Sequence, residues 1–214
     1  MKIANTDAGI PARWLSALRA VQTKFPEAVI AGGALRDLAN GRDVKDVDIW
    51  IKTRGEETKS LLEAALDCPV IDIADLSVES QPATEGELDD VFNVDFPVTP
   101  ASVRLTNPGE LIMPDDAPIQ IIAVNFDVTM DSVIERFDFG ICKAATDGRV
   151  SVLHPSFLAD VERKTFTFLA TNRSETQMDR SLVRYQRLTG DKYAGWTLRG
   201  MEPKPASNDF DWMI

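Results

Sequence analysis

Two aspartates separated by one position, Asp46 and Asp48, are the residues best suited to chemistry. Asp46 directly precedes, and Asp48 lies within, the otherwise apolar stretch Val47-Asp48-Ile49-Trp50-Ile51. Side chains alternate along a strand, so a strand here would place both carboxylates on the same side. Four crowded carboxylate oxygens are costly unless cations neutralise them. Oxygen ligands suit Mg²⁺, and two such ions about 3.5–4 Å apart can hold the attacking and leaving oxygens of an in-line displacement. We therefore expect Asp46 and Asp48 to bind Mg²⁺, with two ions as the expected number and Mn²⁺ as an alternative metal.

A glycine motif precedes the aspartates. Residues 28–31 (Ala-Val-Ile-Ala) are typical of a short buried strand, and Gly32-Gly33 follows directly. Glycines after a strand allow the backbone to approach a phosphate, and the N-terminus of a helix predicted at Leu35 to Asn40 would add N–H donors. Alone, a glycine pair usually marks a tight turn, and an Asp-x-Asp pair is commonly a solvated strand edge. Together, with Arg36-Asp37 between them, the two motifs predict a phosphate-transfer site.

The combined pattern is Gly-Gly-x-x-Arg-Asp at 32–37, followed by Gly-Arg-x-x-Lys-Asp-x-Asp-Ile at 41–49. It resembles the head-domain signature of poly(A) polymerases and CCA-adding enzymes, which belong to the DNA polymerase β-like nucleotidyltransferase superfamily. The match covers about residues 28–52. The resemblance implies a small mixed sheet with flanking helices. It also implies transfer of a nucleoside monophosphate from an NTP to a hydroxyl, with pyrophosphate as the leaving group.

The resemblance also assigns roles by position. The residues that it places at the nucleotide are Gly32, Gly33, Arg36 and Lys45, and those that it places at the metal are Asp46 and Asp48. Asp37 is expected to brace the loop instead of contacting substrate. We therefore expect these residues to lie close together in the folded chain.

Further arginines lie on a helix predicted from Ser174 to about Thr189, which starts with a capping-box pattern and stops at a glycine. Arg180, Arg184 and Arg187 form a basic stripe opposite the apolar one. Such a stripe is most often simply solvated. In the functional interpretation, Arg180 and Arg184 reach the triphosphate or the base, as arginines do in the helix that follows the family's head domain.

Superfamily enzymes usually present a third carboxylate from a neighbouring strand, which helps to accept the proton of the acceptor hydroxyl. The predicted strand Ile119 to Val124 carries Gln120 where a carboxylate would stand, and glutamine is neither an anionic ligand nor a base. Asp138 is the alternative catalytic carboxylate, although it is equally well interpreted as a turn aspartate. Weaker candidates are Asp72 and Asp127. To complete the site, Asp138 must lie on a strand beside that of Asp48, within about 4–6 Å.

The helices and strands that must position these residues can also be predicted from the sequence. Together they indicate an α/β (α+β) fold, with a small mixed β-sheet, flanking helices and a short C-terminal helical extension. We expect a nucleotidyltransferase-like domain over residues 1–170, with an acidic insertion around 74–118, and a C-terminal helix and tail over 171–214. The other predicted helices are 11–25, 56–66 and 131–136, and the other predicted strands are 69–73, one around 92–96, and 139–146. His154 is expected to pack or to cap a helix.

The charge is uneven and limits the partners. The formal net charge of the chain is −11, yet residues 60–135 hold sixteen acidic residues and one basic residue, Arg104. This distribution disfavours a long nucleic-acid footprint. It would instead offer a basic protein partner an acidic surface. The two cysteines, Cys68 and Cys142, are expected to be free thiols. No apolar run is long enough for a membrane span and no signal core is present, so the cytoplasm is the expected location.

The sequence therefore predicts a Mg²⁺-dependent nucleotidyltransferase that uses an NTP. Its acceptor stays open among an RNA 3′ end, a protein side chain and a small molecule. The alternative is a catalytically degenerate protein of the same fold that acts as an acidic binding or inhibitory partner. That alternative would lead if Asp138 were remote from Asp46 and Asp48 while Gln120 lay beside them.

Overall fold

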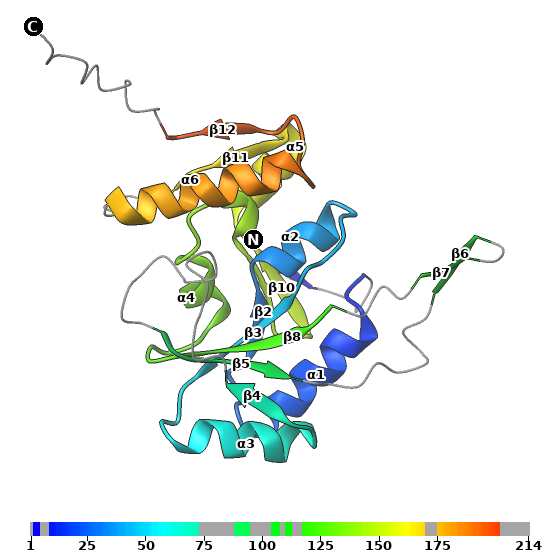
Figure 1. The fold of residues 1–214 in the computed structure, drawn as a ribbon, viewed down its shortest axis with the longest axis vertical. Coiled ribbons are helices and arrows are strands. Elements are labelled where there is room, and N and C mark those ends of the chain that lie inside the picture. Colours follow the sequence, from blue (N-terminus) through cyan, green and yellow to red (C-terminus); the bar gives the residue numbers. More distant parts are fainter. Residues whose placement is uncertain are drawn as a thin grey trace, which may run out of the picture.

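The fold is built around one mixed β-sheet (Figure 1). The computed structural model describes residues 2–4, 9–72, 88–94, 104–107, 110–112, 117–169 and 175–201. Within these ranges eight strands pair in the order β1-β10-β9-β2-β3-β8-β5-β4. Their bounds are β1 (Lys2–Ala4), β2 (Val29–Ala31), β3 (Val47–Lys52), β4 (Val70–Asp72), β5 (Leu88–Val94), β8 (Ile119–Val124), β9 (Ala144–Thr146) and β10 (Val150–Leu153). A separate antiparallel pair is formed by β6 (Arg104–Asn107) and β7 (Glu110–Ile112).

Strand β3 lies inside the sheet, between β2 and β8. It runs antiparallel to β2 and parallel to β8, and Val47 is in register with Ile119. Because side chains alternate along a strand, Val47, Ile49 and Ile51 share one face, and all three are fully buried. The opposite face of β3 is therefore the face that carries Asp48.

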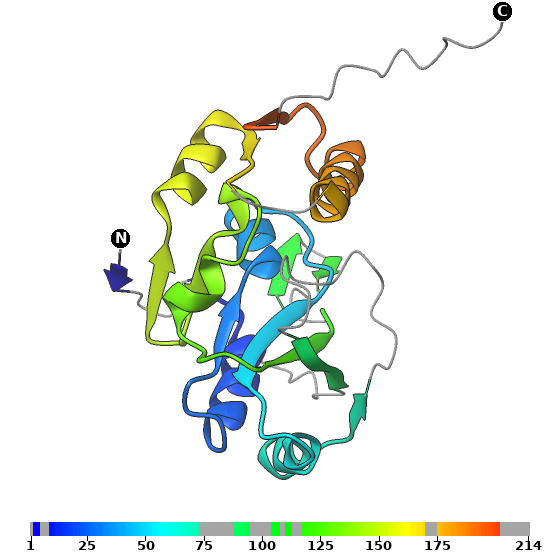
Figure 2. The same cartoon turned by 90° about the vertical axis from the view of Figure 1, so that its left-hand side faces the viewer.

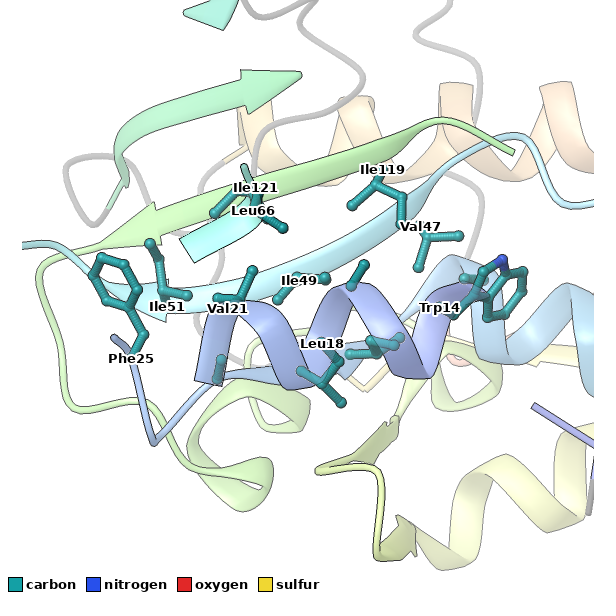
Figure 3. Close-up of a cluster of buried hydrophobic side chains, with 14 of the residues drawn as sticks. Trp14, Leu18, Val21, Phe25, Val47, Ile49, Ile51, Leu66, Ile119 and Ile121 are labelled. Atoms are coloured by element: carbon teal, nitrogen blue, oxygen red, sulfur yellow. The ribbon is translucent and has the colours of Figure 1, made fainter. Parts of the chain in front are cut away.

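Two helices cover the apolar face of β3. Figure 3 shows Leu18 and Val21 of α1 (Ala12–Gln22) close to Ile49 of β3, within the largest buried cluster. Helix α3 (Glu57–Leu66) adds Leu62 and Leu66 to the same cluster. Burying side chains of this size stabilises the folded state by roughly 1.5–3 kcal/mol each, so this layer fixes the position of β3.

The other face of the sheet is only partly covered. Helix α4 (Met130–Ile134) packs there and contributes Val133 to a second buried cluster, which also contains Trp50 of β3 and Ile122 of β8. Helix α2 (Gly33–Ala39) follows β2 directly. The sheet surface around Asp48 lies between these two helices.

The C-terminal elements gather at one end of the molecule, near α2 (Figures 1 and 2). They are α5 (Pro155–Arg163), β11 (Thr165–Thr167), α6 (Glu175–Gly190) and β12 (Thr197–Arg199), with β11 and β12 paired in parallel. Their core is aromatic: the ring of Phe166 lies 5.4 Å from that of Tyr193 and 5.8 Å from that of Trp196, both edge-on. Such pairs contribute beyond their buried area, so this cluster holds α6 against the rest of the chain.

The predicted fold class is confirmed: a mixed sheet, flanking helices and a C-terminal helix are all present. The strand predicted over 139–146 is wrong in its first half, where Gly140–Cys142 forms a 3₁₀ turn, η2. A Cβ at Gly140 would lie 2.7 Å from the Asp160 carboxylate, so the glycine allows a close approach to α5 that a regular strand would not make. Helix α5 itself was not predicted, although Pro155 at its first turn was a usable signal. Most of the predicted acidic insertion lies outside the described residues.

No helix within the described ranges combines the length and apolar character that crossing a membrane requires.

Candidate active site

A cleft of about 520 Å³ opens over the partly covered face of the sheet. Asp48 and Trp50 of β3 line it together with Gln120 and Ile122 of β8, and other lining residues come from α2, the loop before β3, the segment after α4, and α6. Among the described residues, its acidic lining is Asp37, Asp43, Asp46, Asp48, Asp138 and Asp191, and its basic lining is Arg36, Lys45, Arg136, Arg184, Arg187 and Lys192. The two sets are equal in number, so the cleft is close to neutral in a chain whose net charge is −11.

The cleft contains both predicted metal ligands, Asp46 and Asp48. Asp48 lies on β3 and Asp46 just before it, so the alternation expected of a strand places both at the cleft. Burial, together with the neighbouring charge of Asp46, raises the pKa of Asp48 to about 7, although Arg184 and Lys45 partly oppose this rise. The surrounding cations therefore leave the pair incompletely neutralised. A carboxylate pair in this state favours the approach of a further cation.

The glycine pair connects β2 to α2. Gly32 precedes the helix at φ 88°, a conformation that favours glycine, and a Cβ there would lie 2.7 Å from the ring of Phe137. Gly33 lines the cleft, whereas Gly32 is absent from the described lining residues. Of this pair, only Gly33 is among the described residues that line the cleft in which a phosphate is predicted to bind. A glycine is required at position 32 for a steric reason, because a Cβ there would collide with the ring of Phe137.

Arg36 and Asp37 form a buried network. Arg36 Nε donates a 2.6 Å hydrogen bond to Asp37 Oδ1, and its Nη1 contacts Cys142 Sγ at 3.5 Å. The hydroxyl of Tyr193 donates to Asp37 Oδ1 at 2.8 Å, and Lys192 Nζ donates to Oδ2 at 3.1 Å. Burial alone would raise the pKa of Asp37, but Arg36, Tyr193 and Lys192 together hold it below its usual value. Asp37 thus connects α2 to the residues that follow α6.

Lys192 makes a further contact that the sequence did not reveal. Its Nζ donates a 2.6 Å hydrogen bond to the carbonyl of Asp43, in the loop that leads into Asp46. The segment after α6 is thereby tied both to α2 and to the loop of the metal-binding motif. Lys192 comes two residues after Gly190, which ends α6, and no periodicity marks such a position in a sequence.

Asp138 lines the same cleft but does not lie on a strand beside that of Asp48. The neighbours of β3 are β2 and β8, so the condition stated for a third carboxylate at Asp138 is not met by the sheet. Phe139 instead packs edge-on against Phe166, which directs this segment toward the C-terminal elements. There Ser181 Oγ donates a 2.5 Å hydrogen bond to Asp138 Oδ2, and Arg184 Nη1 lies 3.8 Å from the same oxygen.

Gln120 stands beside Asp48. The two residues are in register on the parallel strands β3 and β8, and Gln120 lines the cleft. Within the described part of the chain, no group of three or more His, Cys, Asp or Glu residues is arranged to hold a metal ion. The position expected for a third carboxylate on the neighbouring strand is therefore occupied by a neutral amide.

Most, but not all, of the remaining predicted residues line the cleft. Lys45 lines the cleft with its Nζ 3.8 Å from Asp46 Oδ2, and Arg184 and Arg187 line it from α6. Arg180 is not among the described lining residues, so the predicted basic stripe reaches the cleft only in part. His154 caps α5 by accepting a hydrogen bond from the backbone of Ser156, in line with the capping role expected for it.

Arg136 and Cys142 are among the cleft residues that the sequence analysis did not predict as site residues. Arg136 follows α4, and Cys142 is buried beside Arg36. Arg136 immediately precedes the Phe-Asp-Phe stretch that drew attention to Asp138, so its charge was a signal that could have been used. Cys142 carried no comparable signal.

Comparison with known proteins adds a family and a fold. A family model described as Gabija anti-defense 2 family protein matches residues 8–164. A curated relative named Gabija anti-defense 2, from Bacillus phage SPbetaL7, is 27% identical over 173 residues, which are 79% of this chain and 34% of the relative. This chain thus spans about a third of the length of the curated relative that it matches.

Two solved structures share the fold. A tRNA-processing enzyme in an apo form superposes with a TM-score of 0.58 at 16% identity, covering 89% of this chain and 45% of that one. The Bacillus stearothermophilus CCA-adding enzyme in complex with CTP superposes with a TM-score of 0.55 at 16% identity, covering 89% of this chain and 42% of that one. The chain therefore shares the fold of these two enzymes, in agreement with the fold that the resemblance in the sequence implied. Because the matching family model spans well over half of its residues, the chain belongs to the Gabija anti-defense 2 family.

Proposed function

We propose that this chain binds an NTP with Mg²⁺ in the cleft and transfers a nucleoside monophosphate to an acceptor hydroxyl, releasing pyrophosphate. The observation that carries the proposal is the pair Asp46 and Asp48, which meet at one cleft in a nucleotidyltransferase fold. The raised pKa of Asp48 supports it, because a cation bound to both carboxylates would offset the repulsion that Asp46 and burial impose.

The donor set suits magnesium. Carboxylate oxygens at an open cleft leave room for the water molecules that Mg²⁺ usually retains. Asp46 and Asp48 would hold the ion, which when bound supplies positive charge to the phosphate oxygens. Holding the metal is thus the role proposed for these two side chains.

Basic side chains of the cleft would bind the polyphosphate of the NTP. Arg36, Lys45 and Arg184 come from α2, the loop before β3 and α6, and all three line the cleft. Arg36 is already oriented by its hydrogen bond to Asp37, so it would bind a phosphate with little further loss of conformational freedom. Gly33 would let the backbone approach the same group.

The family suggests the setting in which this chemistry is used. We propose that the chain counteracts Gabija defence, as the name of its family states, and that it does so through the cleft. The acceptor hydroxyl would then belong to an RNA 3′ end, a protein side chain or a small molecule on which that defence depends.

Calorimetry tests the binding step. Four non-hydrolysable NTP analogues are titrated with Mg²⁺ into the chain and into a variant with Asp46→Ala and Asp48→Ala. Asp127→Ala is the matched control, because Asp127 is exposed, pairs with Lys52 and is absent from the described lining of the cleft. Metal-dependent binding should be lost only in the double variant. Binding that is absent, or indifferent to that variant, contradicts the proposal.

Labelling tests the transfer step. NTPs labelled at the α-phosphate are incubated with the chain and a cell lysate, and label is sought in RNA, protein and metabolite fractions. The same two variants are then produced in cells that carry the Gabija defence, and phage plaques are counted. Protection of phage by the wild-type chain and by Asp127→Ala, but not by the double aspartate variant, is the expected result.

A second candidate function has an observation of its own. Gln120 in register with Asp48 favours a chain that keeps the fold but has lost catalysis and acts as a binding partner. The acidic run 60–135 would then supply a surface for a basic protein. In this case a salt-sensitive pull-down of a basic partner should survive the double aspartate substitution, and labelling should stay at background.

A further inference from the structure

The chemistry of Asp46 and Asp48 led us to expect a pair of metal ions, and a second ion requires additional negative charge from the protein or the substrate. Two Mg²⁺ ions about 3.5–4 Å apart hold the attacking and leaving oxygens of a displacement. The two ions repel each other strongly, so anionic ligands must offset this repulsion. For Mg²⁺ these ligands are carboxylate and phosphate oxygens. The question is therefore how many carboxylates this cleft can direct at one point.

The strands beside β3 add none. On β2, the positions in register with β3 are Val29 and Ile30, both apolar. On β8, the residue in register with Asp48 is Gln120, and the next residue on that face, Ile122, is in register with Trp50. A neutral amide and an aliphatic side chain thus stand where a neighbouring strand could offer a carboxylate. An amide oxygen can contact an ion, but it carries no charge to neutralise a second one.

Among the other carboxylates that line the cleft, Asp37 and the Oδ2 oxygen of Asp138 are already held by protein partners. Asp37 accepts hydrogen bonds from Arg36, Tyr193 and Lys192 through its two oxygens. Asp138 accepts the Ser181 hydroxyl at 2.5 Å and lies 3.8 Å from Arg184. Moving the Asp37 carboxylate or the Oδ2 oxygen of Asp138 to a metal would leave buried cations or donors without their partner, which is costly.

Cations of the protein already occupy the surroundings of the aspartate pair. Lys45 Nζ lies 3.8 Å from Asp46, and the charge of Arg184 reaches both Asp48 and Asp138. A second dication would have to approach these fixed positive charges. The geometry is therefore compatible with one divalent ion and unfavourable to two.

We infer that the cleft holds a single divalent ion, on Asp46 and Asp48, and that Gln120 is the residue that prevents binding of a second. The inference rests on the proposed function for the identity of the site, and it departs from the two ions that the aspartate pair was expected to bind. Gln120 acts here as a determinant of metal number. Replacing its amide by a carboxylate of similar size should create the missing ligand.

Counting manganese tests this directly. Mn²⁺ is titrated by electron paramagnetic resonance into the chain in the presence of α,β-methylene ATP and the corresponding analogues of GTP, CTP and UTP. The complex of the wild-type chain with the nucleotide should hold one Mn²⁺ in total, with the spectrum of an isolated ion. Gln120→Glu and Gln120→Asp should bind two, with the exchange coupling expected of ions about 3.5–4 Å apart. Gln120→Asn, which keeps the amide, is the control and should bind one.

The outcomes separate the two proposals. Two coupled ions in the wild-type chain overturn the inference and leave the proposed function intact. One ion in the wild-type chain and no second ion in either carboxylate variant, each folded as judged by circular dichroism, overturns the role of Gln120. No ion in the wild-type chain, with or without nucleotide, overturns both proposals.

Discussion

The hydroxyl of Tyr193 donates a 2.8 Å hydrogen bond to the carboxylate of Asp37, although the two residues are 156 positions apart in the chain. Asp37 belongs to α2, directly after the glycine turn, and Tyr193 follows α6. The bond therefore joins the two walls of the cleft that the proposed function assigns to phosphate binding. Lys192, one residue earlier, reinforces this connection through Asp37 and the carbonyl of Asp43.

Tyr193→Phe should lower the free energy of unfolding by about 1.5–3 kcal/mol, because it removes a hydrogen bond to a buried charged carboxylate and leaves that acceptor less satisfied. Tyr185→Phe is a matched control. Its hydroxyl donates to the neutral carbonyl of Trp196, so its loss should cost only about 0.5–1.5 kcal/mol. Urea denaturation measures both variants. Equal decreases in the free energy of unfolding would show that the hydrogen bond to Asp37 stabilises the fold no more than the hydrogen bond to the neutral carbonyl of Trp196 does.

The stability of the metal-free chain should depend on pH through Asp48. Its pKa is raised to about 7 in the folded chain, so between about pH 4 and pH 7 the folded state keeps a proton that the unfolded state has released. The free energy of unfolding therefore falls as pH rises through this window, by up to about 1.4 kcal/mol per pH unit from this group. Asp48→Asn should flatten that slope.

Asp127→Asn is the control for this measurement. The pKa of Asp127 is lowered by the hydrogen bond and charge of Lys52, so its contribution changes below about pH 4, outside the window. Its profile between pH 4 and pH 7 should match that of the wild-type chain. A wild-type profile that stays flat between pH 4 and pH 7 would show that Asp48 titrates at its ordinary value.

Local patterns were sufficient to predict that Asp46 and Asp48 lie on the same side of a strand. Alternation along β3 is a property of the strand itself, so the sequence alone places Asp46 and Asp48 at one face while Val47 and Ile49 enter the core. The turn at Gly32 is equally local, because its positive φ requires a glycine whatever surrounds it.

The partners of Asp138 could not be predicted in the same way. They depend on the packing of Phe139 against Phe166, which draws the segment away from the sheet, and on Ser181 lying 43 positions further along the chain. No period of two or 3.6 residues encodes a contact of this kind. Register across strands is non-local in the same sense, although the apolar alternation of β3 and β8 did anticipate the position of Gln120 beside Asp48.

Gly32→Ala should destabilise the chain more than Gly41→Ala. Both glycines have positive φ, 88° and 60°, so an alanine costs on the order of 1–3 kcal/mol at either position. Only at Gly32 would the new Cβ also meet a side chain, the ring of Phe137 at 2.7 Å, whereas nothing lies within 4 Å at Gly41. Adding Phe137→Leu to Gly32→Ala should recover part of the steric loss. Thermal unfolding of the three variants measures this, and a Gly32→Ala variant no less stable than Gly41→Ala would contradict the close packing.

Arg184→Gln should weaken binding of an NTP analogue far more than Arg180→Gln. Both arginines lie on α6 and were predicted as nucleotide-binding residues, but Arg184 lines the cleft and Arg180 is not among its described lining residues. A hydrogen bond from a guanidinium to a phosphate contributes about 1.5–3 kcal/mol, so removing it should raise the Kd by roughly 10- to 150-fold. Arg180→Gln should change the Kd by less than about threefold, the effect of a charge outside the cleft.

The same pair of variants also reports on the electrostatic effect of Arg184 on Asp48. Glutamine at position 184 keeps a hydrogen-bonding group but removes the charge 3.8 Å from the Asp138 carboxylate, so both Asp138 and Asp48 lose a stabilising cation. The apparent pH midpoint of metal binding by Asp48 should then move upward in Arg184→Gln and stay unchanged in Arg180→Gln, as measured by Mn²⁺ titration at several pH values. Equal effects of the two substitutions on affinity and on the midpoint would mean that α6 influences the site only through its overall charge.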